Sequence, residues 1–141
     1  MLGSQSQESL FKLVHCLKQN VLEQIEELDL DIAPMHVRVL KIISRKPQCT
    51  AVDIANFLER DKAQVTRLLN SLIKQELVVK APNPEDKRSQ CLRITDSGLV
   101  IMSKIAGVDK AMLEKMKQGI SEEEMEKFQR IMAKMISNLS N

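Results

Sequence analysis

The sequence predicts a mostly helical α+β fold in which helices surround one short pair of strands. Apolar residues recur at helical spacing over most of the 141 residues. Helix-start signals, with Ser, Thr or Asp three residues before an acidic or amide side chain, interrupt that pattern several times. Two short strand-like stretches, "LVVKA" and "CLRIT", flank the charged segment "PNPEDKRSQ".

Composition limits the class of protein. The chain is 43% hydrophobic but only 2% aromatic, so the core must be built from Leu, Ile, Val and Met. No apolar run approaches the roughly 20 residues of a membrane span, and no signal peptide opens the chain. We therefore expect a cytoplasmic protein with no membrane association. Three widely spaced cysteines without a CxxC pair suit a reducing compartment better than a disulfide framework.

Charge is distributed unevenly along the chain. Residues 1–33 have a net charge of −4 and residues 96–141 a net charge of 0. Residues 34–95 contain twelve basic and six acidic side chains, a net charge of +6. A basic middle segment suggests a polyanionic partner, although ordinary surface lysines are the alternative interpretation.

Two helices are expected first. An apolar stripe with one residue per turn predicts a long helix over residues 8–29. Pro34 suits the first turn of a second helix, which runs to about Lys46 and is stopped by Pro47.

Two further helix starts follow in quick succession. The stretches "TAVD" and "DKAQ" both approximate a capping box and predict helices over residues 51–58 and 62–75. Only about three residues separate these helices, so the pair predicts a helix-turn-helix, with a generic helical hairpin as the alternative.

The second of these helices has two distinct faces. One face carries Val65, Leu68, Leu69, Leu72 and Ile73 and must belong to the core. The opposite side contains a base, amides and hydroxyls but no carboxylate, which is unusual for a solvated helix. Such side chains match base edges and phosphates, so we predict a DNA-reading face that consists of Ala63, Gln64, Thr66, Arg67, Asn70 and Lys74.

The strands, expected over residues 77–81 and 91–95, complete a winged helix-turn-helix. Arms of four or five extended residues reach roughly 13–17 Å. With the second helix in a major groove, that reach brings Lys87 and Arg88 to the adjacent minor groove, where negative potential is concentrated. The flanking prolines stiffen the hairpin. A disordered loop with incidental charge is the alternative.

Two helices close the chain. Thr95 caps one over residues 96–118, and the capping box of Ser121 and Glu124 begins the last over residues 122–139. The terminal helices carry more Met and Leu side chains on one face than a single chain of this length can bury. A twofold partner would bury them, which predicts a homodimer.

Taken together, these features resemble the multiple-antibiotic-resistance regulator (MarR) family. The resemblance covers nearly the whole chain, and its specific part is "DKAQVTRLLNSLIKQELVVKAPNPEDKRSQCLRITDSG", residues 61–98. This part carries the Asp-x-Arg wing motif and the Leu-x-Ile-Thr-x-x-Gly close. The chain departs from the family pattern at Glu76, where Gly usually precedes Leu-Val. Either Glu76 adopts the positive φ that Gly favours, or the turn is built differently.

The resemblance implies a homodimer that binds pseudo-palindromic promoter DNA, represses transcription and is released by a small ligand. It divides the chain into a dimerisation helix (8–33), a DNA-binding winged lobe (34–95) and dimerisation helices (96–141). It assigns base reading in the major groove to Arg67, and a minor-groove contact to Arg88 braced by Asp86. Thr50 and Lys62 complete the expected double-stranded-DNA contacts.

An effector site is expected where the first, second and fifth helices meet. Three bases recur at helical spacing on the second helix, beside the acidic end of the first: Arg38, Lys41 and Arg45. With apolar walls, such a cleft would suit a small amphipathic anion. The alternative is a cleft closed by side chains.

The sequence offers little support for other functions. No Gly-rich phosphate loop, zinc pattern or catalytic triad is visible, so we expect neither an enzyme nor a cofactor. A site at His15, Cys16 and His36 is conceivable, but no metal is predicted. A cysteine redox sensor of the same fold is an alternative; the absence of Tyr favours a buried, inert Cys16 and a structural Cys91. A winged helix that contacts only proteins is the remaining alternative.

Overall fold

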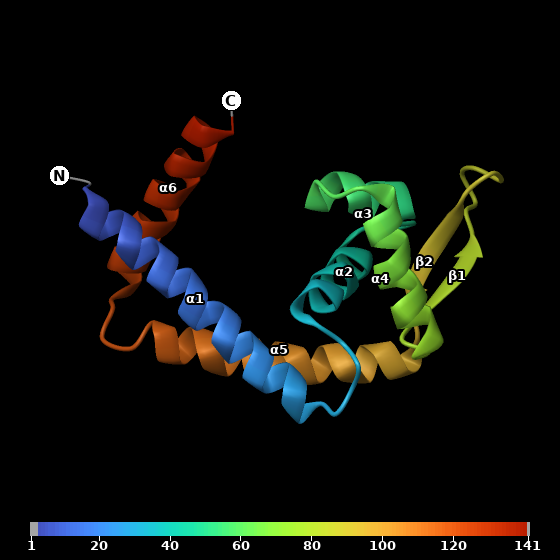
Figure 1. The fold of residues 1–141 in the computed structure, drawn as a ribbon, viewed down its shortest axis with the longest axis horizontal. Helices are drawn as coiled ribbons and strands as arrows, with labels where there is room; N and C mark the ends of the chain where they lie inside the picture. The colour runs from blue at the N-terminus through green and yellow to red at the C-terminus, as the bar shows by residue number, and fades with distance from the viewer. Residues whose placement is uncertain (1–2, 141) are drawn as a thin grey trace. The chain divides into compact units, whose positions relative to one another are not determined.

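The computed structural model describes residues 3–140, which form six helices and one two-stranded sheet (Figure 1). The fold class predicted from the sequence is confirmed. The chain divides into two compact units at the boundary between Ala106 and Gly107, within the fifth helix. In chain order the elements are α1 (Ser4–Glu27), α2 (Pro34–Arg45), α3 (Ala51–Leu58), α4 (Lys62–Lys74), β1 (Val78–Pro82), β2 (Gln90–Ile94), α5 (Asp96–Met116) and α6 (Glu122–Leu139).

The core of the first unit lies among α2, α3, α4 and the hairpin. Leu40, Ile54 and Leu72 are the largest side chains that are fully buried there. The expected aliphatic core is confirmed except for methionine, because no Met of the described chain is among the buried residues. Met102 is only partly buried and packs against the outside of the core.

The helix caps explain where the helices begin. Thr50 Oγ1 accepts a hydrogen bond from the Asp53 amide, and Asp53 Oδ2 accepts one from the Thr50 amide, so the capping box of α3 is confirmed. The box at the start of α4 is only half formed: Asp61 accepts from the Gln64 amide at 2.8 Å, but the reciprocal bond from Asp61 N–H is missing. The amide of a Gln is a poorer partner for that N–H than a carboxylate.

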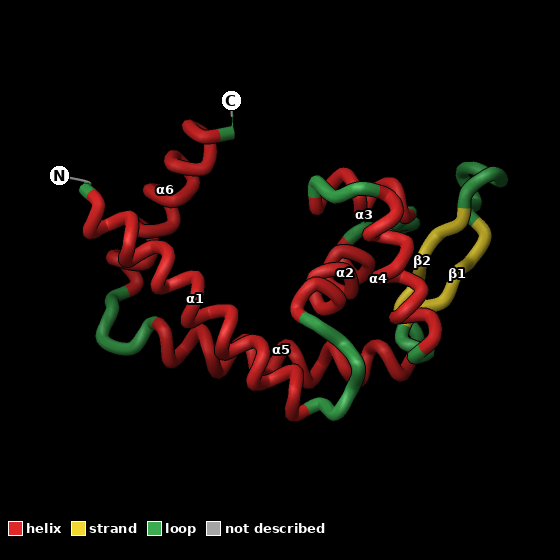
Figure 2. The backbone as a smooth tube through the Cα atoms, in the orientation of Figure 1, coloured by secondary structure: helices red, strands yellow, loops and turns green. Residues whose placement is uncertain are grey.

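The hairpin is antiparallel, with Val78 opposite Ile94 and Pro82 opposite Gln90. Figure 2 shows its two strands in yellow and the loop that joins them in green. Before β1, Glu76 adopts a φ of 61°, so the departure from glycine is accommodated by a left-handed glutamate rather than by a different turn.

Several apolar side chains of the terminal helices are exposed to solvent. On α1, Leu10, Phe11 and Val14 are exposed. On α6 no residue is buried, and Ile131 and Ile136 are exposed. Part of the apolar surface of both terminal helices therefore faces solvent within the described chain.

Within residues 3–140, no helix combines the length and the apolar character needed to cross a bilayer.

Candidate nucleic-acid interface

The outward face of α4 has the character that the sequence predicted. Val65, Leu69 and Leu72 are buried. Leu68 and Ile73 pack partly against the same core. Lys62, Ala63, Thr66, Arg67, Asn70 and Lys74 are exposed, and Gln64 is half-buried. No carboxylate lies between Lys62 and Lys74. The helix therefore presents donors and cations to any partner on this side.

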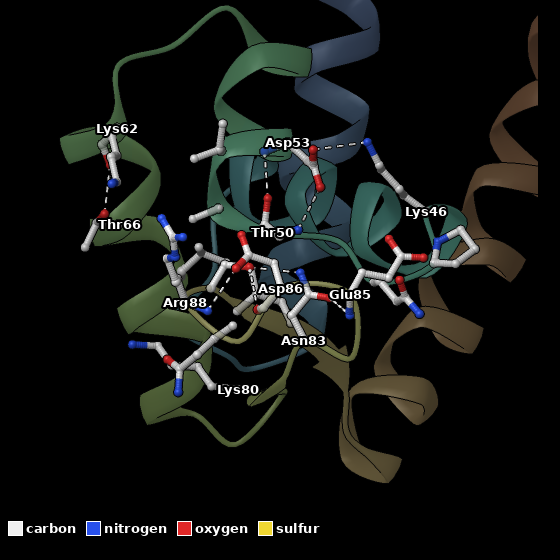
Figure 3. A pocket seen from close by; sticks show the side chains of 18 of the residues that line it. Lys46, Thr50, Asp53, Lys62, Thr66, Lys80, Asn83, Glu85, Asp86 and Arg88 are labelled. Carbon is white, nitrogen blue, oxygen red and sulfur yellow. Dashed lines mark hydrogen bonds and ion pairs between the residues drawn. The ribbon is translucent and has the colours of Figure 1, made fainter.

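An open groove of about 800 Å³ separates α4 from the wing (Figure 3). Lys62, Thr66 and Asn70 line it from α4, and Arg88 lines it from the wing. Thr50 at the start of α3 also contributes. Residues that the sequence predicted separately, in a cap, a helix and a loop, thus share one surface.

Other predicted residues lie outside this groove. Arg67 and Gln64 line a second, smaller groove of about 360 Å³, together with Met35, His36, Arg60 and Leu68. Ala63, Lys74 and Lys87 line neither groove, although all three are exposed. Sequence reasoning missed Lys80, which borders the large groove, and Arg60, which borders the small one. Their only signal was a positive charge close to the predicted elements.

The wing tip is an ordered structure. Asn83 Oδ1 accepts a hydrogen bond from the Glu85 amide at 3.0 Å, and Asp86 Oδ1 accepts one from the Arg88 amide at 2.9 Å. Asn83 Nδ2 donates to Ser89 Oγ at 2.9 Å across the loop. These bonds argue against the alternative of a disordered loop. Asp86 contacts Arg88 through the backbone amide of Arg88.

Acidic side chains in the large groove are held by donors. The Thr50 amide and Lys46, whose Nζ lies 3.2 Å from Oδ1, lower the pKa of Asp53, with the amide as the larger cause. Because its negative charge is shared with these donors, Asp53 repels an approaching anion less than a free carboxylate would.

The cysteines differ from expectation at one position. Cys16 is exposed on α1, so the prediction of a buried thiol is wrong for the described chain. The absence of Tyr, on which that prediction rested, bears on the reactivity of a thiol and not on its exposure. Cys49 and Cys91 are buried; burial and, secondarily, the charge of Asp53 raise the pKa of Cys49 to about 11.

The two histidines have separate surroundings. His36 Nδ1 accepts a hydrogen bond from the Ala33 amide at 2.8 Å, which caps α2. Burial lowers the pKa of His36, opposed by the charge of Asp31. His15 is exposed on α1. Within residues 3–140, no three His, Cys, Asp or Glu side chains are grouped as a metal site would need.

The predicted effector residues lie on α2 but outside both grooves. Arg38 and Arg45 are exposed, and Lys41 is half-buried.

A helix-turn-helix followed by a two-stranded wing defines the winged-helix class of protein. The model of the MarR family matches residues 30–89. The multiple antibiotic resistance protein MarR of Escherichia coli is 31% identical over 94 residues, which are 65% of either chain. The transcriptional repressor IacR of Pseudomonas putida is 25% identical over 121 residues, 86% of this chain and 71% of that protein.

Solved structures agree with these sequence matches. The complex of Staphylococcus aureus MepR with DNA superposes with a TM-score of 0.80 at 26% identity, over 92% of this chain and 94% of that one. A MarR protein of Peptoclostridium difficile gives the same TM-score at 25% identity, over 99% and 90% of the two chains. The family model, these relatives and the solved structures all show that the chain is similar to the MarR family of winged-helix transcriptional regulators.

Proposed function

We propose that the protein is a homodimeric repressor that binds pseudo-palindromic double-stranded DNA, with α4 in the major groove and the wing in the adjacent minor groove. The observation that carries this proposal is the shared groove: the carboxylate-free face of α4 and Arg88 of the wing border one concave surface. The similarity to MepR, whose structure was solved in complex with DNA, supports DNA binding by this fold.

Each side chain of the interface has a role that suits its chemistry. Arg67, Gln64 and Asn70 present forked donors or amides to base edges, with Ala63 beside them. Cations and hydroxyls contact phosphates, which positions α4 without reading sequence; these residues are Thr50, Lys62, Thr66 and Lys74. Lys87 and Arg88 enter the minor groove, and Asp86 fixes the backbone of Arg88.

Dimerisation rests on the uncovered apolar residues of the terminal helices. We assign residues 8–33 and 96–141 to dimerisation and residues 34–95 to DNA binding. Exposed Leu10, Phe11 and Val14 on α1, and Ile131 and Ile136 on α6, cost free energy in water. A second copy that presents the same residues across a twofold axis would bury them.

A duplex-binding experiment tests the proposal. The protein should sediment as a dimer at micromolar concentration and select genomic fragments whose half-site centres lie about one helical turn, roughly 34–36 Å, apart. Affinity for the selected duplex should fall steeply with added salt, because phosphate contacts release counterions. A folded monomer in solution would contradict the dimer. Equal affinity for selected and scrambled duplexes would contradict sequence-specific binding.

Release by an amphipathic anion is the remaining part of the proposal. The basic side chains of α2, Arg38 and Arg45 with Lys41 between them, provide the charge that a carboxylate needs. A ligand that binds the non-DNA-binding state better lowers DNA affinity by that difference, typically about 1–3 kcal/mol. In a gel-shift titration with salicylate-like and fatty carboxylates, compounds that raise the Tm of the free protein should also release DNA. A panel that does neither at millimolar concentration contradicts this part alone.

A further inference from the structure

The loop between α2 and α3 contacts the wing at two levels. In the middle of the ladder, the Leu92 amide of β2 donates a hydrogen bond to the Cys49 carbonyl at 2.8 Å. Nearer the tip, the side chain of Gln48 meets that of Glu85. With its amide oriented so that nitrogen faces the carboxylate, Gln48 donates to Glu85 Oε1 at 3.1 Å and to Oε2 at 3.2 Å. Both residues border the large groove.

The position of Gln48 is fixed by an unusual backbone. Its φ is 54°, in the left-handed region that costs a residue with a side chain roughly 1–2 kcal/mol. This conformation directs the loop toward the wing between the end of α2 and the cap of α3. The neighbouring Leu92–Cys49 bond ties the loop to the middle of β2, so Gln48 reaches the wing from a fixed point.

Glu85 is connected to Arg88 through the tip. The Glu85 amide donates to Asn83 Oδ1, Asn83 Nδ2 donates to Ser89 Oγ, and the neighbouring Asp86 accepts from the Arg88 amide. A contact that restrains Glu85 therefore also restrains the rest of the wing tip, including the backbone of Arg88. The Gln48 contact reaches beyond the last ladder pair, Pro82 and Gln90, where strand pairing no longer constrains the hairpin.

We propose, on the basis of the function proposed above, that the Gln48–Glu85 contact is a latch that positions the wing so that Arg88 enters the minor groove. Gln48 and Glu85 are then positioning residues. The latch also accounts for a carboxylate in a groove that faces DNA: a free Glu85 would repel phosphates, whereas here the acceptor holds the tip in place. Without the latch, the tip moves about the end of the ladder and Arg88 loses its preorganisation.

Variants that separate hydrogen bonding from charge test the latch. Gln48→Ala removes the donor without changing charge, and Gln48→Gly does so with a residue that suits the positive φ. Glu85→Gln keeps an acceptor but removes the charge, and Glu85→Ala removes both. Gln118→Ala, at an exposed glutamine in the turn after α5, is the matched control. Unchanged Tm values establish that each variant is folded.

The probe is a fluorescent duplex selected with the wild-type protein, used with A·T pairs or with G·C pairs beneath the wings. Gln48→Ala and Gln48→Gly should lower affinity for the A·T-flanked duplex about threefold to tenfold, the range for the net contribution of one typical hydrogen bond, and reduce the preference over G·C flanks. In an Arg88→Ala background, neither Gln48 variant should lower the affinity much further, because both act through Arg88. Glu85→Gln should retain the flank preference, whereas Glu85→Ala should lose it.

The alternative is that Glu85 acts only as a repulsive charge. It predicts that Glu85→Gln and Glu85→Ala tighten binding equally and that both Gln48 variants behave as the wild type. If Arg88→Ala weakens binding to the same duplex, that pattern overturns the latch and leaves the proposed function intact. If the wild-type protein prefers no selected duplex to a scrambled one, both proposals fail.

Discussion

Replacing Arg88 with alanine is expected to weaken binding to the selected duplex by about 1–3 kcal/mol per half-site. The guanidinium lies exposed on a tip whose backbone is fixed by Asp86, so little backbone entropy is lost when it docks. In a narrow A·T-rich minor groove the negative potential is concentrated, and a cation there contributes more than one against a phosphate on the outer surface. The loss should therefore be largest for duplexes with A·T flanks.

Fluorescence anisotropy over a range of salt concentrations measures this effect. Arg67→Ala provides the comparison, because its side chain lies on α4 and should relax the sequence preference within the half-site rather than in the flanks. Lys117→Ala, which removes one exposed charge in the second unit, controls for net charge. Unchanged affinity and salt slope for both Arg variants would show that the wing and the α4 face are assigned wrongly.

Local signals account for most of the fold that could be predicted. Cap residues act through hydrogen bonds within three residues, so Thr50 and Ser121 mark helix starts without knowledge of the tertiary structure. The spacing of apolar residues is likewise a local signal, and it predicts which face of α4 is buried and which is exposed. Composition carries no such positional information: the absence of Tyr does not show where Cys16 lies, and for this reason its burial was predicted wrongly.

The candidate site could be predicted only in part. The chemistry of Arg67, Asn70 and Arg88 is visible in the sequence, whereas the groove that joins α4 to the wing depends on tertiary packing. The contact between Gln48 and Glu85 is the extreme case. Both residues are exposed and polar, they are distant in the chain, and no local pattern pairs them. Such contacts appear only once the loop and the wing are placed together.

Gly98 provides the largest expected change in stability. It lies in the first turn of α5, buried against the segment that leads into β1. A Cβ at this position would collide with the Leu77 carbonyl oxygen and would lie 2.7 Å from Ile94 Cγ2. The Leu77 oxygen cannot easily move, because it accepts a hydrogen bond from the Thr95 amide at 3.1 Å. Thr95 Oγ1 holds the same corner by donating to the Glu76 carbonyl and accepting from the Gly98 amide.

Gly98→Ala should therefore lower the free energy of unfolding by about 1–3 kcal/mol, the usual cost of forcing an extra carbon into a packed site. The opposite sign is expected for Gly107→Ala in the same helix, where a Cβ meets nothing within 4 Å. There the gain in helix propensity should stabilise the protein by about 0.5–1 kcal/mol. Urea unfolding of both variants at one protein concentration measures the pair. Because helix propensity favours Ala at both positions, a loss of stability confined to Gly98→Ala can come only from the corner formed by Glu76, Leu77 and Thr95. Equal stabilisation of both variants would show instead that this corner accommodates a methyl group.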